Sequence, residues 1–454
     1  MLFSSIEFIF FFLPLSLIFY FAAPQKARNV ILLVFSLVFY GWGEPKYLLL
    51  MLATIALDYL FGLLIERNRG RAKLWLWGAV VSNLGSLAVF KYLSPTLGFF
   101  GLDFVSLALP VGISFYTFQS LSYVIDVYRG EKAQKDPVAF GAYITMFPQL
   151  VAGPIVRYGD IAVQLKERYT DTQKTARGIL RFVCGLSKKL LFANSAGEMW
   201  RYFSSLPRGE LSTLGAWLGI VFFAFQIYFD FSGYSDMAVG LGLFFGFDFP
   251  GNFNYPYIAT SIRDFWHRWH ISLTVWFREY VYIPLGGNRK GEARTLFNML
   301  TVWALTGIWH GASLNFLAWG LYYFILLACE RLFWGKLLKR LPRLLSRIYS
   351  LTAILVGWVF FSAESIGDAF SYLGRMFSLN APMGNDVYHL ERNIPFLILL
   401  ILGSTPIPLE AFRSLMQKGG ARRSLLSLGS ILIFILCVAD LVGASYNPFL
   451  YFRF

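Results

Sequence analysis

The chain has 454 residues, of which 57% are hydrophobic and 15% charged, and its formal net charge at pH 7 is +14. A water-soluble globule needs a polar surface and averages roughly 45–50% apolar and about 25% charged residues, so the composition excludes a soluble enzyme, a disordered chain and a disulfide scaffold. Basic loops that orient a membrane protein explain the positive charge, and since no basic stripe carries stacking aromatics, we expect no nucleic-acid partner.

The first apolar run, Ile6–Ala23, has no Lys or Arg before it, whereas a signal peptide carries its positive charge in front. We therefore expect a retained transmembrane helix whose N-terminus lies outside. Further apolar segments predict helices near 29–42, 46–65, 74–93, 107–128, 137–155, 178–196, 213–233, 236–250, 295–333 (two helices), 348–362, 394–412 and 424–443.

Gly, Pro and polar residues concentrate in 107–160 and 230–290, where several segments are too short or too broken to cross a bilayer. Irregular backbone at membrane depth is tolerated only where protein or a water-filled cavity shelters it, so we expect re-entrant or interfacial pieces there. The sequence predicts an all-α polytopic membrane protein, a single domain over 1–454, with about 11–14 membrane-embedded helices including re-entrant ones.

The basic loops predict the orientation of this bundle in the bilayer. The positive-inside rule places Lys26–Arg28, the cluster from Arg67 to Lys73, Lys336–Arg347 and Lys418–Arg423 in the cytoplasm. The stretch 363–393 and the C-terminus then lie outside.

His310 is the sharpest candidate for chemistry. It lies in an apolar segment between Gly307 and Gly311, whose spacing predicts a thin helical face that a ligand or another backbone can approach. An ionisable group inside a membrane is costly and is a functional hypothesis by default. A neutral imidazole can accept a proton from a hydroxyl or thiol, which suits general-base catalysis. The alternative is a histidine that hydrogen-bonds between helices.

A second cluster lies in the segment 261–280, where Arg and Trp repeat as they do at a membrane interface. An interfacial amphipathic helix explains most of these residues. His270 is the exception, because it precedes Ile271 and can point inward. His267 and His270 lack the i, i+4 spacing and the intervening Glu of a helical zinc site, and the three cysteines form no Cys-x-x-Cys pair, so we expect no metal.

A third polar island, Tyr228–Met237, contains Asp230, Tyr234 and Asp236 in apolar surroundings. Buried carboxylates need partners, and structural hydrogen bonding explains them better than acid–base chemistry. Arg157, which follows a Gly-Pro break, is a candidate partner.

Other catalytic signatures are missing. Gly233-Tyr-Ser235-Asp-Met237 lacks the closing glycine of a nucleophile elbow, and there is no Walker loop. The basic glycine turn Pro284–Lys290 fits a phosphate contact and a plain cytoplasmic loop equally well.

Taken together, these motifs resemble the membrane-bound O-acyltransferase (MBOAT) family, and within it the bacterial alginate O-acetylation (AlgI-type) branch. The strongest match is Phe265–Thr274 (FWHRWHISLT) together with Trp309-His310-Gly311. Further matching stretches cover nearly the whole chain: Leu2–Ser5, Gly112–Gly130, Val151–Pro154, Tyr228–Gly242, Tyr282–Arg289 and Asn447–Phe454.

The resemblance implies a helical bundle with a central tunnel or funnel, in the bacterial inner membrane. It implies that His310 is the catalytic histidine and His270 the second histidine of the site. It also implies acyl transfer, most simply of acetyl from cytoplasmic acetyl-CoA, with no bound cofactor, toward a cell-envelope polysaccharide such as alginate. An extracytoplasmic SGNH-type acetyltransferase is the implied partner. Supporting or substrate-binding roles are expected for Trp309, Asn315, Asp236, Tyr234, Asp230, Arg157, His267 and Trp269.

One residue departs from the family pattern, and three other functions stay open. His267 stands where many members have Arg, which puts the local charge pairing in doubt. The alternatives to acetyl transfer are transfer of D-alanyl or another acyl group, a solute transporter with an intramembrane His/Asp relay, and a scaffold for the partner enzyme.

Overall fold

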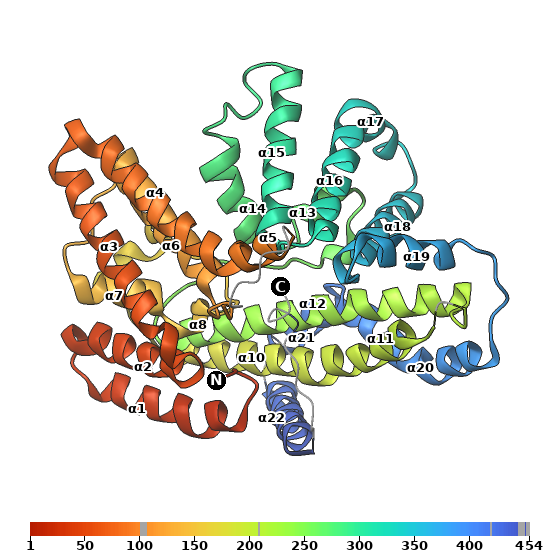
Figure 1. Cartoon of the computed structure of the whole chain (residues 1–454). Coiled ribbons are helices and arrows are strands. Elements are labelled where there is room, and N and C mark those ends of the chain that lie inside the picture. Colours follow the sequence, from red (N-terminus) through yellow and green to blue (C-terminus); the bar gives the residue numbers. More distant parts are fainter. Residues whose placement is uncertain (100–106, 208, 418–419, 444–449, 451–454) are drawn as a thin grey trace. The chain divides into compact units, whose positions relative to one another are not determined.

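The computed structural model divides the chain into two compact units, both built from helices (Figure 1). The first unit contains residues 1–185 and 234–251, and the second contains 186–233 and 252–454. The prediction of a single domain stays a prediction. The structure describes residues 1–99, 107–207, 209–417, 420–443 and 450.

The first unit begins with a π-helical turn, Phe8–Phe12, that continues directly into helix α1, so a helix over most of Ile6–Ala23 is confirmed. Phe8–Ala22 is shorter than the six candidate spans, and its crossing of the membrane stays a prediction. Its helices are α1 (Leu13–Ala22), α2 (Arg28–Gly43), α3 (Leu48–Arg67), α4 (Ala72–Ala88), α5 (Ser94–Phe99), α6 (Ile113–Arg129), α7 (Pro137–Thr145), α8 (Phe147–Leu150), α9 (Tyr158–Lys166) and α10 (Thr172–Ser187).

Helices α3, α4 and α6 pack side by side in this unit (Figure 1). The approach of α3 to α6 depends on Gly62, because a Cβ there would overlap the hydroxyl of Tyr123. Between α3 and α4 the buried carboxylate of Asp58 accepts a hydrogen bond of 2.8 Å from the Asn83 amide. This hydrogen bond gives one oxygen of the buried carboxylate a partner on the neighbouring helix.

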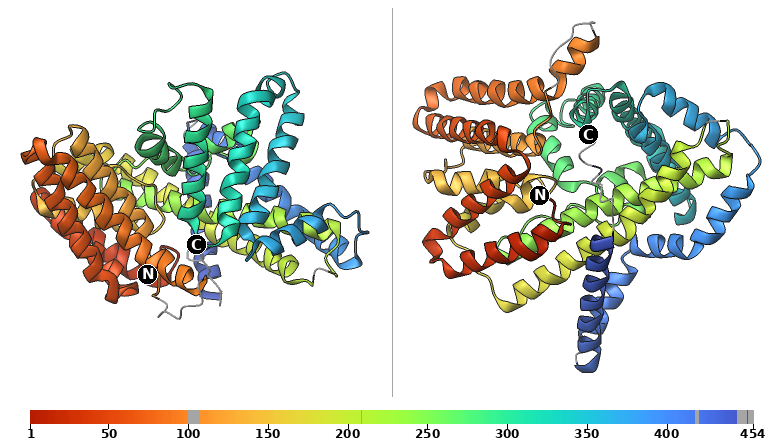
Figure 2. Two further views of the ribbon diagram at one scale, coloured as in Figure 1. Left: turned by 45° about the horizontal axis from the view of Figure 1, so that its top comes forward. Right: turned by 60° about the horizontal axis from the view of Figure 1, so that its bottom comes forward.

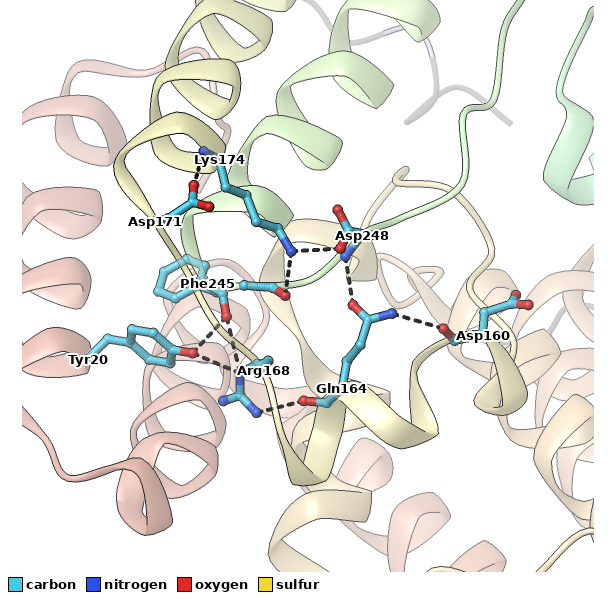
Figure 3. A network of polar contacts seen from close by, with 9 residues as sticks. Tyr20, Asp160, Gln164, Arg168, Asp171, Lys174, Phe245 and Asp248 are labelled. Carbon is cyan, nitrogen blue, oxygen red and sulfur yellow. Dashed lines mark hydrogen bonds and ion pairs between the residues drawn. The ribbon is translucent and has the colours of Figure 1, made fainter.

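A polar network closes the first unit around Arg168, which follows α9 (Figure 3). Its Nε donates to the Tyr20 hydroxyl at 2.8 Å and to the Phe245 carbonyl at 3.1 Å. Lys174 donates to the Asp248 carboxylate at 2.6 Å. The network ties the α9–α10 connection to α1 and to the turn after Phe244.

The second unit contains the long apolar helices and the short helices of the FWHRWHISLT segment. Its helices are α11 (Ser195–Ser205), α13 (Ile262–Trp266), α14 (Ile271–Phe277), α15 (Glu292–His310), α16 (Leu314–Cys329), α17 (Gly335–Leu338), α18 (Arg343–Ser362), α19 (Ile366–Met376), α20 (Gly384–Gly403), α21 (Ile407–Gln417) and α22 (Gly420–Gly443).

Helix α12 (Thr213–Phe244) corrects the prediction of two separate segments over 213–250. The polar island Tyr228–Met237 lies inside this one helix, with residues 213–233 in the second unit and 234–244 in the first. Within the helix, Asp230 is paired with Lys189 and Asp236 with Arg181.

Helices α15 and α16 run side by side (Figure 2). A Cβ at Gly307 would lie 2.5 Å from the Phe316 carbonyl oxygen of α16, so the predicted close approach of another backbone occurs there. Gly311 is different. Helix α15 ends at His310, and Gly311 is extended, so the expectation that it shares a helical face with Gly307 is wrong.

The described residues contain six helices that are long and apolar enough to cross a membrane, or seven if the bent pair α20 and α21 forms one span. A multi-pass membrane protein is therefore confirmed, while the larger count of embedded and re-entrant pieces stays a prediction. The residues 418–419 of one predicted cytoplasmic loop, and all of the Asn447–Phe454 motif except Leu450, lie outside the described residues. The six spans are Pro45–Arg67, Arg69–Leu97, Thr213–Phe244, Leu314–Leu338, Arg343–Ser362 and Ser424–Gly443.

Candidate active site

Four residues predicted from the sequence, His310, His270, Asp230 and Trp269, line one cavity of the second unit. Its volume is about 40 Å³, enough for one or a few water molecules or for a small acyl group. The cavity brings together two imidazoles and a carboxylate from separate segments. The other lining residues are aromatic or aliphatic: Ile227, Phe231, Trp319, Trp358, Phe361 and Leu450.

His310 is the last residue of α15 and is half-buried. Its ring packs edge to face against Trp319 at 5.0 Å and against Phe361 at 5.1 Å between ring centroids. Aromatic edges on two sides hold the imidazole in one orientation at the cavity wall. The helix ends here because Gly311 turns the chain into an extended conformation.

His270 is 2% exposed and has a left-handed backbone, with φ of 44°. A residue with a Cβ rarely adopts this conformation, and such residues cluster at functional sites. Its Nδ1 lies 3.3 Å from Oδ1 of Asn252. Burial lowers the pKa of His270 to about 3, so the imidazole, which lies outside the six candidate spans, is neutral at pH 7.

Asn252 fixes which nitrogen of His270 carries the proton. Oδ1 of Asn252 also accepts from the backbone N–H of Ser272 at 3.1 Å and from its hydroxyl at 3.0 Å. This oxygen is therefore an acceptor, and Nδ1 of His270 must be the donor. Nε2 of His270 then carries a lone pair, and it has no hydrogen-bond partner among the described residues. No local sequence pattern marks Asn252, which only precedes a short helical turn.

Asp230 forms a buried ion pair with Lys189, whose Nζ lies 2.7 Å from Oδ1. The other carboxylate oxygen accepts the backbone N–H of Leu450 at 2.9 Å. Lys189 belongs to a π-helical segment, Lys188–Asn194, and was missed by sequence reasoning. A signal for Lys189 was available, because a lysine inside an apolar stretch needs a partner for its charge.

The predicted residues Tyr234, Asp236 and Arg157 belong to the first unit. Asp236 pairs with Arg181 at 3.0 Å, and Arg157, which was expected as a partner at a helix break, pairs with Asp160 at 2.9 Å. Tyr234 stacks on Phe3, with ring centroids 4.5 Å apart.

Trp309 and Asn315 support the cavity without lining it. Trp309 is buried, and its ring lies 6.4 Å from the His270 ring and 4.8 Å from the His310 ring between centroids. The Asn315 amide donates to the carbonyls of Phe360 at 3.2 Å and Ala363 at 2.8 Å, which fixes the start of α16 to the end of α18.

His267 lies apart from these residues, in the lining of a second and larger cavity of the same unit. Its Nδ1 lies 2.7 Å from the Arg263 carbonyl oxygen, so the ring is held by its own helix turn. Within the described part of the chain no three His, Cys, Asp or Glu side chains gather as metal ligands would.

A comparison with protein families matches residues 134–364 to MBOAT, the membrane-bound O-acyltransferase family. The matched region contains all the residues of the FWHRWHISLT segment and His310. It extends from α7 to the end of α18.

Three relatives with assigned names are similar to this chain. It is 36% identical to the "Probable alginate O-acetylase AlgI" of Azotobacter vinelandii over 100% of both chains. It is 35% identical to the "Peptidoglycan O-acetyltransferase" of Helicobacter pylori over 86% of this chain and 82% of the relative. The "Teichoic acid D-alanyltransferase" of Bacillus subtilis is 31% identical over 55% of this chain and 66% of the relative.

Proposed function

We propose a specific reaction for this chain from the premise that it belongs to the membrane-bound O-acyltransferase family. It is a multi-pass membrane O-acyltransferase. The proposed reaction moves an acetyl group from cytoplasmic acetyl-CoA across the bacterial inner membrane, for O-acetylation of an extracytoplasmic polysaccharide such as alginate. The proposed partner is an SGNH-type acetyltransferase that delivers the group to the polymer.

One observation carries the proposal: two imidazoles line the cavity beside α15, in a wall that is mostly aromatic. An aromatic wall excludes bulk water, which strengthens electrostatic interactions inside and limits hydrolysis of a thioester. Charged CoA does not cross a bilayer, so its thioester has to approach such a base from the cytoplasm while the acceptor approaches from the other side.

In the proposed step His310 accepts the proton of the acceptor hydroxyl as its oxygen attacks the thioester carbonyl carbon. The carbonyl electron pair moves onto oxygen and forms a tetrahedral oxyanion. When the oxyanion collapses, the C–S bond breaks and the leaving thiolate takes the proton back from the His310 imidazolium. The products are an ester and free CoA, and the enzyme is regenerated unchanged.

His270 and Trp319 take different parts in this proposal. The neutral His270 offers a lone pair at Nε2, so it suits accepting a hydrogen bond from the incoming hydroxyl rather than donating to an oxyanion. Trp319 lines the same cavity, is 1% exposed, and its Nε1–H has no acceptor among the described residues. A buried donor without an acceptor is costly in the resting protein, and we assign it to the oxyanion.

Acetyl is favoured over D-alanyl as the transferred group because the two relatives named for O-acetylation match far more of this chain than the D-alanyltransferase does. Alginate is favoured over peptidoglycan as the acceptor by the full-length match of both chains in the alginate case.

The test is acetyl transfer in membrane vesicles that contain this protein, its SGNH partner, alginate and radiolabelled acetyl-CoA. We expect the wild-type protein to label the polymer and a normally inserted His310→Ala protein to lose the labelling. His389→Ala is the matched control, because His389 packs on Tyr202 and lies outside the cavity lining. Labelling by His310→Ala at the wild-type rate would remove His310 from catalysis. In cells, glycan acetylation could persist in the His310→Ala strain and be lost when the whole gene is deleted. That result would show that the protein acts as a scaffold for its partner enzyme.

A further inference from the structure

The second cavity of this unit is larger than the first, with a volume of about 260 Å³, and the proposed chemistry does not use it. It lies between the segment 263–282 and the face of α15 that precedes His310. Its lining changes in character from charged at the exposed residues to aromatic at the buried ones.

The exposed part of the lining is cationic. Arg263, His267 and Arg278 are all exposed and all line the cavity. The carboxylate of Glu279, 3.2 Å from Arg278, is the partner of one of these guanidinium groups. The ring N–H of His267 is donated to the Arg263 carbonyl, and the nearby Glu330 carboxylate accepts the backbone N–H groups of Ile262 and Arg263. The donors that suit an anion at this mouth are therefore the guanidinium groups of Arg263 and Arg278.

The buried part of the lining is apolar. Three lining side chains are only 4% to 7% exposed: Trp266, Leu273 and Phe277. The half-buried Trp303 also lines the cavity, and its ring centroid lies 4.7 Å from that of Trp266. A site with donors at the mouth and rings below suits an amphipathic ligand whose anionic end stays near solvent.

Helix α15 connects this cavity to the catalytic one. The α15 residues that line the second cavity include Met299, Trp303 and Thr306. At 3.6 residues per turn, these three residues lie on the same face of the helix as His310. A rise of 1.5 Å per residue puts Met299 about 16 Å from His310 along the axis. The indole of Trp319, 5.7 Å from Trp266 and 6.1 Å from Trp303 between centroids, belongs to the wall of the first cavity.

We infer that the second cavity binds a phosphate-bearing amphipath, with the phosphate between Arg263 and Arg278 and a slender chain over Trp266 and Phe277. Two molecules at a membrane surface carry this chemistry: a CoA thioester and an anionic phospholipid. If the occupant is CoA, the inference rests on the proposed function, and the pantetheine arm would follow the α15 face toward His310. If the occupant is a phospholipid, the inference is independent of the proposed function.

The test uses the full-length protein in phosphatidylcholine nanodiscs, with CoA as a soluble probe, and in phosphatidylglycerol nanodiscs followed by native mass spectrometry of retained lipid. The variant is Arg263→Gln with Arg278→Gln. The control, Arg268→Gln with Arg294→Gln, removes the same charge from neighbouring positions outside the cavity lining. Met299→Trp keeps the cations and fills the cavity, which separates lost phosphate binding from misfolding.

A loss of CoA affinity of about tenfold or more in the cavity variants, but not in the control, assigns the site to the donor. A loss of retained phosphatidylglycerol in the cavity variants alone assigns it to a lipid. Unchanged binding of both probes, or equal losses in the control, overturns the inference. The binding measurement needs no turnover, so its result is independent of whether His310→Ala abolishes acetyl transfer.

Discussion

Lys189 and Asp230 form an ion pair in which Nζ and Oδ1 are 2.7 Å apart and both side chains are 3% exposed. The carboxylate that lines the catalytic cavity is therefore neutralised by a lysine from another segment, and its second oxygen is occupied by the Leu450 N–H. A carboxylate held in this way serves the fold and the local electrostatics of the cavity rather than proton abstraction.

Removing one member of this pair is expected to be strongly destabilising, because it leaves an uncompensated buried charge. Asp230→Ala or Lys189→Met should lower the free energy of unfolding by about 3–5 kcal/mol. The double variant Lys189→Met with Asp230→Leu should recover most of that loss, since apolar side chains replace both charges. Thermal unfolding in detergent micelles measures this, and a double variant less stable than either single variant would contradict it.

His270 makes stability depend on pH. Its pKa is about 3 in the folded protein, against about 6.5 in an unfolded chain, so its contribution is fully present above pH 6.5 and is lost as the pH falls below that value. At pH 5 the loss should be about 2 kcal/mol. The melting temperature of the wild-type protein should therefore fall more between pH 7.5 and pH 5 than that of His270→Gln. Equal falls would show that His270 does not stay neutral.

Much of the fold follows from sequence because a helix in lipid must satisfy its own backbone groups, which makes apolar segments long and visible. The exception is α12. Glycine and two carboxylates at 230–236 look like a break, but Asp230 and Asp236 meet Lys189 and Arg181, and those cations belong to segments distant in the chain. Local composition does not reveal partners of this kind.

The site residues likewise differ in whether a local sequence signal marks them. His310 and His270 could be predicted because an imidazole in apolar sequence is costly without a purpose. Asn252 and Trp319 could not be predicted, because an asparagine before a turn and one tryptophan among 13 carry no local signal. Their importance arises from the His270 tautomer and from an indole N–H without an acceptor, both of which depend on tertiary packing.

Trp319→Phe tests the assignment of the oxyanion donor. The substitution keeps an aromatic ring near His310 and removes the N–H, so kcat should fall by about 10²–10³ while KM for acetyl-CoA changes little. Trp217→Phe is the matched control, because it removes an indole hydrogen bond to the Met376 carbonyl away from both cavities. If the two variants lose kcat to the same extent, Trp319 acts through packing and the oxyanion donor is another group.

Gly307→Ala tests how closely His310 depends on the contact between α15 and α16. The added Cβ would lie 2.5 Å from the Phe316 carbonyl oxygen and 3.1 Å from the Leu317 Cα, and both are backbone atoms that do not move independently of α16. Separating the helices should cost about 1–3 kcal/mol of stability.

Because His310 lies less than one turn beyond Gly307, the same shift should displace its imidazole and lower acetyl transfer in the vesicle assay. The control is Gly429→Ala in α22, where a new Cβ meets no atom within 4 Å and transfer should be unchanged. A Gly307→Ala protein with reduced stability but wild-type transfer would show that the position of the ring tolerates movement of α15. The catalytic geometry would then be set by the aromatic contacts of His310 with Trp319 and Phe361 instead.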